Sequence, residues 1–324
     1  MRKLLSIISF LTLAATAYAQ MMPDSTVQVV AYWELGDKVR YQVEESKRKV
    51  SGTDTTLVEK SAEIITLEIV DVTDSTYRIN VSYDDFQHSD YARMAANDAL
   101  EKTYGKTSFD IITDQYGSFL DIELPDYFAE EGDAAIDEMV AGASRDKGLS
   151  KEEQKVVSLF VKSLISPDAF TQAAIAEISP LLFFHGGRYG LSEEIEYDDE
   201  VQSIFGDEST ITMHSRFWVD EDLTDEESVV MRIYQEADRD ELQPYLASVL
   251  SQMTGAFAPD DKDAMKEVEE FLEESEMYLE DYVVEEVHLP TGWPVAYIHT
   301  RYVGMAVDDE VSEQIIRRCV EIMD

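Results

Sequence analysis

The strongest constraint on the fold lies near the end of the chain, where two strand-like runs flank a short break. Residues 282–289 and 295–305 are rich in β-branched and aromatic side chains, and the five residues between them include two prolines and a glycine. A break of this composition between two such runs predicts a β-hairpin. Because a long helix-like stretch precedes this hairpin, we expect the chain to return here and complete a sheet that begins at Trp33.

The N-terminal third of the chain shows the alternation that is typical of half-buried strands. In residues 76–83, Tyr77, Ile79, Val81 and Tyr83 alternate with polar side chains, and a similar pattern runs through residues 39–44 and 57–71. Alternation with a period of two places one face against a core and the other against water. Short turns separate these segments, so we expect an antiparallel meander.

Beyond residue 125 the apolar period becomes helical over two long stretches, residues 126–180 and 238–280. The first contains a capping-box sequence at Ser150 and a new helix start at Ser166-Pro167-Asp168. The second divides into helices at 238–257 and 261–279. Residues 311–322 fit either a strand or a helix, and we favour a strand. We therefore predict an α+β fold in which a curved antiparallel sheet, an incomplete barrel, is covered by inserted helices.

The first 19 residues have the three parts of a secretory signal peptide. Arg2 and Lys3 are basic, an apolar run follows, and Ala17-Tyr18-Ala19 supplies the small residues of a cleavage site. We expect a mature protein that begins at Gln20 and lies in the periplasm or outside the cell. No later run is long and apolar enough to predict a transmembrane helix.

The mature chain, residues 20–324, contains no internal repeat and no Pro/Ser-rich linker, so we expect a single domain. A subdivision near residues 186–190 is the alternative. Cys319 is the single cysteine, which excludes an internal disulfide and leaves stability to the core. We interpret Cys319 as a small buried residue rather than a reactive thiol.

The composition is strongly acidic, with 68 Asp and Glu against 26 Lys and Arg and a formal net charge of −42. Nucleic acid is excluded as a partner, because phosphate binding needs clustered basic side chains. Anionic lipid headgroups would also repel such a surface. The charge favours solubility, and it attracts basic partners or divalent ions.

No motif for catalysis, cofactor binding or metal binding is present. The Gly-x-Ser-x-Gly, Walker and Gly-x-Gly-x-x-Gly patterns are absent. None of the five histidines has a close metal-ligand spacing, and His288 and His299 lie too far apart on the predicted hairpin to share an ion. The acidic run from Asp220 lacks the glycine and glutamate of a calcium loop, since Asp225 and Met231 occupy those positions. We predict no catalytic residue, no metal and no cofactor.

Bulky apolar side chains supply the one candidate site. Together with Trp33 and the run 181–184, the aromatic residues exceed what a thin sheet core needs. The simpler interpretation is that they fill the space between sheet and helices. The functional interpretation is that sheet and helices leave a cavity for a lipophilic ligand. Its predicted binding residues are Phe183, Phe184, Tyr189, Trp218 and Trp293.

Three short motifs carry a resemblance to known proteins. Leu35-Gly36-Asp37 opens the first strand, Asp114-x-x-Gly117 marks a turn, and Thr291-Gly292-Trp293 closes the last hairpin. In this layout the chain resembles secreted, β-rich bacterial proteins that are grouped only as domains of unknown function. It is more distantly similar to periplasmic lipoprotein-carrier proteins, and that resemblance implies an incomplete β-barrel covered by helices.

These observations favour an exported, non-enzymatic binding protein whose partner is a lipophilic ligand or an envelope protein. One alternative is a structural or interaction protein of the cell envelope that acts through its acidic surface. A second alternative is a hydrolase whose site has no recognisable motif. The sequence does not predict an oligomeric state.

Overall fold

The computed structural model describes most of the strands and two helical segments of the chain. The described residues are 25–52, 54–90, 108–124, 167–202, 210–224, 227–245, 275–307 and 310–323. The predicted signal peptide, the helix predicted at 91–102 and the capping box at Ser150 lie outside these residues.

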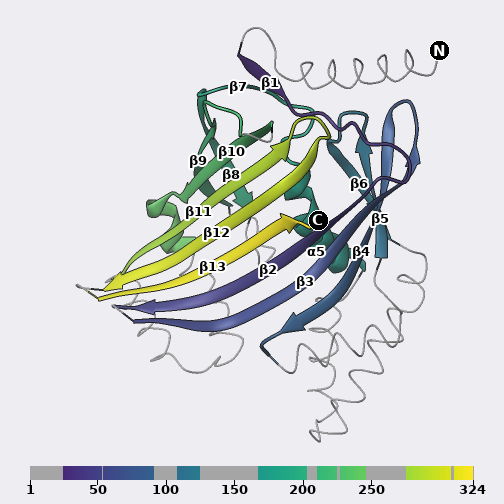
Figure 1. Ribbon diagram of the computed structural model, residues 1–324. Coiled ribbons are helices and arrows are strands. Elements are labelled where there is room, and N and C mark those ends of the chain that lie inside the picture. Colours follow the sequence, from purple (N-terminus) through teal and green to yellow (C-terminus); the bar gives the residue numbers. More distant parts are fainter. Residues whose placement is uncertain are drawn as a thin grey trace, which may run out of the picture.

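One antiparallel sheet dominates the described chain (Figure 1). Its eleven strands follow the order β6-β5-β4-β3-β2-β13-β12-β11-β10-β9-β8, and a separate pair, β1 and β7, forms a small second sheet. The strand bounds are β1 Thr26–Gln28, β2 Lys38–Ser51, β3 Asp54–Val72, β4 Thr76–His88, β5 Ser108–Asp114, β6 Phe119–Glu123, β7 Arg188–Gly190, β8 Glu194–Gln202, β9 Thr210–Val219, β10 Ser228–Ala237, β11 Ser275–His288, β12 Trp293–Val307 and β13 Glu310–Ile322.

The predicted α+β fold with inserted helices is wrong for the described chain, which is almost all β. Strands account for 69% and helical residues for 10% of it. The helical elements are α5, Pro167–Ile178, the 3₁₀ helix η1, Ser179–Leu182, and residues 239–245. The helix predicted to reach Leu279 ends too late, because β11 begins at Ser275 and pairs with β12 from there. In this stretch Met277, Leu279 and Val283 are spaced by even numbers of residues and so lie on one face of the strand. Pairing within the sheet therefore outweighs the helical pattern that the acidic residues suggested.

The predictions for the C-terminal hairpin are confirmed. Strands β11 and β12 pair with each other, and residues 311–322 form most of strand β13. Strand β13 pairs on its other side with β2, from Ser312 opposite Ser51 to Ile322 opposite Tyr41. The last strands of the chain therefore join the N-terminal meander in one sheet.

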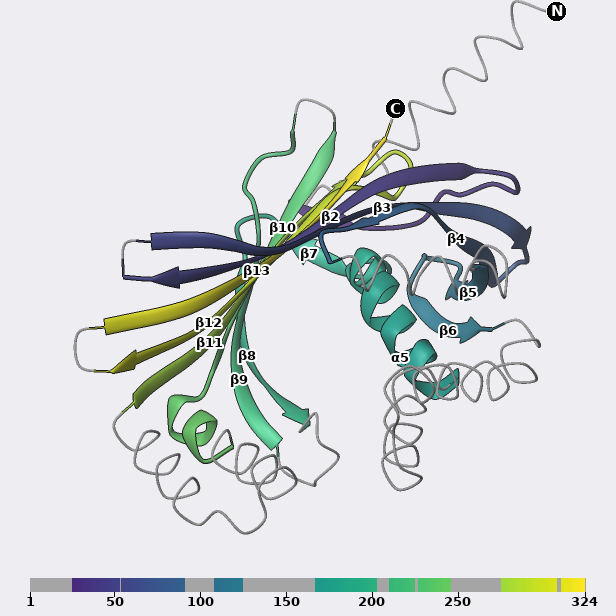
Figure 2. The same cartoon turned by 90° about the horizontal axis from the view of Figure 1, so that it is seen from below.

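The sheet curves strongly, and its concave side holds the helix. Seen from below, α5 lies beneath the middle of the sheet, with β5 and β6 on one side and β8 and β9 on the other (Figure 2). The face that contacts α5 is called the inner face here. Its residues alternate along each strand with those of the outer face, as in β9, where Phe217 and Val219 are buried and Arg216 is exposed.

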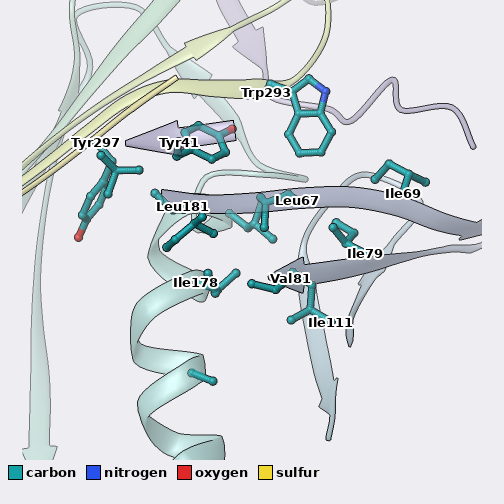
Figure 3. Packing of buried hydrophobic residues seen from close by; sticks show 14 of the residues in the cluster. Tyr41, Leu67, Ile69, Ile79, Val81, Ile111, Ile178, Leu181, Trp293 and Tyr297 are labelled. Atoms are coloured by element: carbon teal, nitrogen blue, oxygen red, sulfur yellow. The ribbon is translucent and has the colours of Figure 1, made fainter. Parts of the chain in front are cut away.

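A hydrophobic core joins α5 and η1 to the inner face. Ile178 and Leu181 point from this helical segment toward Leu67 and Val81 (Figure 3). These side chains, like Tyr41, are at most 1% exposed. Full burial of a large apolar side chain contributes about 1.5–3 kcal/mol, so this cluster fixes the position of α5 on the sheet.

Two distant turns meet at one end of the core, in a cluster that we call the apex: Trp33, His185, Trp293 and the turns that contain Gly117 and Gly292. The Trp33 and Trp293 rings stack with their centroids 4.3 Å apart, and the His185 ring lies 5.5 Å from that of Trp33. The Nε2–H of His185 donates to the carbonyl oxygen of Gly292 over 2.6 Å. A Cβ at Gly117 would lie 2.6 Å from the His185 ring, so only glycine allows this contact.

Candidate ligand-binding site

The structure distributes the five predicted ligand-binding residues over three places. Phe183, Phe184 and Tyr189 lie together after η1, whereas Trp293 is part of the apex. Trp218 projects from the outer face of β9, because its neighbours Phe217 and Val219 are buried on the inner face. The five residues therefore do not converge on one site, and only the first three share one.

Phe183, Phe184 and Tyr189 form an aromatic cluster with Phe217 of β9. The Phe184 centroid lies 5.3 Å from that of Phe217 and 5.8 Å from that of Tyr189, while Tyr189 lies 5.2 Å from Phe217. Such separations are typical of favourable edge-to-face and tilted contacts. The Phe183 ring lies 5.1 Å from Phe184 and is 61% exposed. The cluster thus extends from the interior to the surface.

The turn between Phe184 and Tyr189 holds the two rings in place. The Tyr189 hydroxyl donates to the carbonyl oxygen of Phe184 over 3.0 Å. A Cβ at Gly187 would overlap the Tyr189 ring, so glycine is required there, and Gly186 has a φ of +79°. These two glycines let the chain reverse tightly over the inner face.

Beneath this cluster lies a carboxyl group that the sequence analysis missed. Glu285 of β11 is 0% exposed, and neither of its carboxyl oxygens has a hydrogen-bond partner among the described residues. It lies opposite Met231 of β10 and Tyr297 of β12. Burial raises its pKa well above the ordinary value of a glutamate, so the carboxyl is held neutral.

Three tyrosines lie within electrostatic range of Glu285. Burial raises the pKa of Tyr41 and Tyr297, and it raises the pKa of Tyr189 to about 12. The charge of Glu285 is the second cause for each of the three tyrosines. The Tyr41 hydroxyl donates to the carbonyl oxygen of Pro294 over 3.0 Å. Glu285 thus lies within electrostatic range of both the core cluster, through Tyr41 and Tyr297, and the aromatic cluster, through Tyr189.

A second group of carboxyls lies where α5 contacts the sheet. Glu177 of α5 accepts hydrogen bonds from Arg318 of β13 and from the Tyr83 hydroxyl, both over 2.9 Å. Glu63 of β3 also bonds Glu177, and burial followed by the charge of Glu177 raises the pKa of Glu63 to about 7. Arg318 acts in the opposite direction and offsets part of this increase in the pKa of Glu63.

A third polar group lies further along the inner face. Asp281 of β11 accepts two hydrogen bonds from Arg301, both 2.8 Å, and one from His299 over 2.7 Å. Burial alone would raise the pKa of Asp281, but these bonds hold it below its ordinary value. Among the carboxyls of the inner face discussed here, Asp281 and Glu177 have cationic partners and Glu285 has none.

The rim of the aromatic cluster contains further exposed apolar surface. Ile195 of the edge strand β8 lies opposite Phe217 and is 43% exposed. Tyr189 and Tyr197 are partly buried and pack against the same cluster. Phe183 and Ile195 therefore add exposed apolar surface at the edge of the aromatic cluster.

Trp218 belongs to a different surface. It lines a shallow outer-face pocket of about 380 Å³ together with Glu194, Arg216 and Asp220. Arg232 binds Asp220 with two hydrogen bonds of 2.9 Å and holds one wall of this pocket. The pocket is polar, so it does not suit the lipophilic ligand for which Trp218 was predicted.

The described segments contain neither a candidate metal site nor a membrane-spanning helix. No group of three or more His, Cys, Asp or Glu side chains there has the geometry to hold a metal ion. No described helix is both long and apolar enough to cross a membrane. His288 and His299 serve local bonds instead, to Thr291 and Asp281.

Comparison with known proteins identifies no family. No protein-family model and no curated protein matches the chain. Three solved structures resemble it weakly. A structure concerned with lipid–protein interactions in lipovitellin has 10% identity and a TM-score of 0.38, and the match covers 90% of this chain but only 25% of that one.

Of the other two, one is an outer membrane protein by its description. Ail, the attachment invasion locus protein of Yersinia pestis, has 5% identity and a TM-score of 0.15, with 90% of this chain and 100% of that one covered. A loop-deletion mutant of OmpT, an outer membrane protein of Vibrio cholerae, has 9% identity and a TM-score of 0.21, with coverages of 89% and 100%. At these TM-scores the function has to be inferred from the site itself.

Proposed function

We propose that this protein is an exported, non-enzymatic binding protein that holds a lipophilic ligand on the inner face of its sheet. The ligand lies beside the aromatic cluster of Phe183, Phe184, Tyr189 and Phe217. The predicted signal peptide supports export to the periplasm or beyond. The sheet runs without interruption across both sides of residues 186–190, which supports a single domain over residues 20–324.

Glu285 is the observation that carries the proposal. A buried polar group without a partner costs about 1–3 kcal/mol in a native protein, and a carboxyl that must also be kept neutral adds to that cost. A site that places such a group under an aromatic cluster is suited to receive the polar end of an otherwise apolar molecule. Phe183 and Ile195 supply exposed apolar contact at the rim.

Two measurements test the proposal. The purified protein is extracted with organic solvent and the extract is analysed by mass spectrometry, with a co-expressed unrelated exported protein as the control. The neutral fluorescent probe N-phenyl-1-naphthylamine is then titrated into delipidated protein. We expect an extracted apolar compound and saturable probe binding that the compound displaces.

Matched variants locate the binding. Phe183→Ser removes an exposed ring from the aromatic cluster and should weaken probe binding at least fivefold. Leu35→Ser is the control, because Leu35 is 68% exposed in the turn before β2 and lies outside the cluster. Equal probe affinity in both variants, or an empty protein that binds no probe, would overturn the proposal.

A further inference from the structure

The structure also indicates which polar group the ligand carries. Glu285 offers two unpartnered oxygens, and the cationic side chains of the inner face described above are already engaged: Arg318 binds Glu177, and Arg301 and His299 bind Asp281. No cation of the described chain compensates Glu285. A ligand hydroxyl or amide would satisfy one oxygen, whereas a cation would also compensate the charge of the ionised carboxyl.

We propose that the polar end of the ligand is an alkylammonium group, which binds the Glu285 carboxylate among Tyr41, Tyr189 and Tyr297. This inference rests on the proposed function, because it assumes that the apolar part of the ligand lies against the aromatic cluster. Tyrosine rings attract cations through their π faces, and this attraction strengthens when the cation is shielded from water. The surroundings of Glu285 thus combine a carboxyl group with aromatic side chains, the two partners that an ammonium group prefers.

The charge of the protein favours the same class of ligand. The formal net charge of −42 attracts cations and repels carboxylate or phosphate amphiphiles. Strand β8, which borders the aromatic cluster at Ile195, exposes Glu194, Glu196 and Asp198 on its outer face. A cationic amphiphile is therefore concentrated at the rim by which it would enter.

Entry requires movement of the segment between Phe183 and Tyr189. Glu285 is fully buried, and Phe184 is buried as well, whereas the Phe183 ring that lies 5.1 Å from Phe184 is exposed. The segment is held by the bond from the Tyr189 hydroxyl to the Phe184 carbonyl, by backbone bonds of Gly186 and Gly187 with Val29, and by the bond of His185 to Gly292. Displacement of the segment would break these bonds and the pairing of β7 with β1, but it would leave the eleven-stranded sheet intact.

The binding reaction has a proton balance that can be measured. Because burial raises the pKa of Glu285 well above the ordinary value of a glutamate, we expect the unliganded carboxyl to hold a proton, and an alkylammonium ion that pairs with the carboxylate displaces this proton to the solvent. Binding at pH 7 is therefore expected to release about one proton per ligand. Calorimetric titration in two buffers of different ionisation enthalpy measures this number directly.

The test compares octylammonium with octanoate and 1-octanol, each below its micelle concentration, on the full-length mature protein. We expect octylammonium to bind at least tenfold more tightly than the other two and to release about one proton. Glu285→Gln should abolish both the preference and the proton release. Glu286→Gln is the control: it removes the same charge from the neighbouring residue, which faces the outer side, and should change neither.

Each outcome separates this inference from the proposed function. Equal binding of the three probes, or octylammonium binding that Glu285→Gln leaves intact, overturns the alkylammonium inference while the lipophilic site stands. Absence of binding by every probe, including N-phenyl-1-naphthylamine, overturns both. A thermal melt of each variant confirms that it is folded, and Glu285→Met provides a second, apolar replacement in case Glu285→Gln fails to fold.

Discussion

The apex and the Glu285 site both bury a titratable group among aromatic rings, yet they do so in opposite ways. At the apex, His185 donates a hydrogen bond from Nε2 to Gly292 and lies against Trp33, while its Nδ1 and the Trp33 Nε1 have no partner among the described residues. At the Glu285 site, the carboxyl has no partner of any kind among the described residues. The packing of the apex therefore stabilises the fold, whereas the unpartnered Glu285 carboxyl lowers the stability at a site where a bound ligand would restore it.

The two groups also respond oppositely to pH. Burial lowers the pKa of His185 from 6.5 to about 4, so its contribution to stability is complete above pH 6.5 and is lost as the pH falls toward 4. Burial raises the pKa of Glu285, so its contribution is complete at low pH and is lost as the pH rises above the ordinary range of a glutamate.

Trp293→Ala tests whether the apex is the stabilising region. Loss of a buried ring that stacks on Trp33 should lower the free energy of unfolding by about 3–5 kcal/mol, as measured by urea denaturation. Trp218→Ala, which removes a partly exposed ring from the outer face, should cost about 1 kcal/mol. Equal losses would contradict the distinction between the apex and the outer face.

The pH dependence of unfolding tests the state of His185. Because its pKa is lowered from 6.5 to about 4, we expect a loss of about 2 kcal/mol in the free energy of unfolding between pH 7 and pH 5. His185→Gln should remove this part of the pH dependence. His214→Gln serves as the control, since His214 is an exposed histidine bound to Asp198 and Asp238. An unchanged pH profile in His185→Gln would show that another group titrates.

Glu285→Leu tests the cost of the unpartnered carboxyl. A leucine of similar volume should raise the free energy of unfolding by about 1–3 kcal/mol, because the buried polar group is removed and its apolar surroundings remain. The gain should grow as the pH is raised. Glu286→Leu, on the outer face, is expected to change stability by about 0.5 kcal/mol or less. A clear loss of stability in Glu285→Leu would mean that the carboxyl has a partner in solution.

Glu63→Gln tests the raised pKa of Glu63, at the contact between α5 and the sheet. The pKa of Glu63 is raised to about 7, so the wild type should lose stability as the pH rises from 4.5 through 7. We expect the variant to be less sensitive over this range by about 1 kcal/mol, since Arg318 offsets part of the repulsion. Hydrogen exchange at the backbone of α5 measures the effect locally, and identical exchange in both proteins at pH 8 would argue against it.

The sequence predicted those parts of the fold in which the local pattern of residues agrees with the tertiary contacts. The prolines and glycine of residues 290–294 marked the last hairpin, and Pro167 marked the start of α5. The helix predicted over 261–279 was wrong at its end, because side chains of β11 that suit a helix equally well are fixed as a strand by pairing with β12. The first residues of β11 pair with the last residues of β12, at the end of the hairpin that lies furthest from the turn. No residue near Ser275 in the sequence therefore shows that this stretch is a strand.

The candidate site was only partly predictable. Phe183, Phe184 and Tyr189 were chosen for their bulk, and the turn at Gly186 and Gly187 brings them together. Trp218 and Trp293 were chosen for the same reason but point elsewhere, since bulk does not reveal which face of a strand a residue occupies. Glu285 did leave a signal: it interrupts the apolar register of Val283 and Val287, and a charged residue in that register indicates an unusual environment.

The pairing of β2 with β13 has a consequence for how the chain reaches its folded state. Tyr41 and Ile322 lie side by side in the centre of the sheet although almost the whole chain separates them. The sheet therefore cannot be completed until the last strand has been synthesised, and contacts of such long sequence separation form slowly. Under the export proposed above, this delay would keep the polypeptide unfolded while it is carried across a membrane.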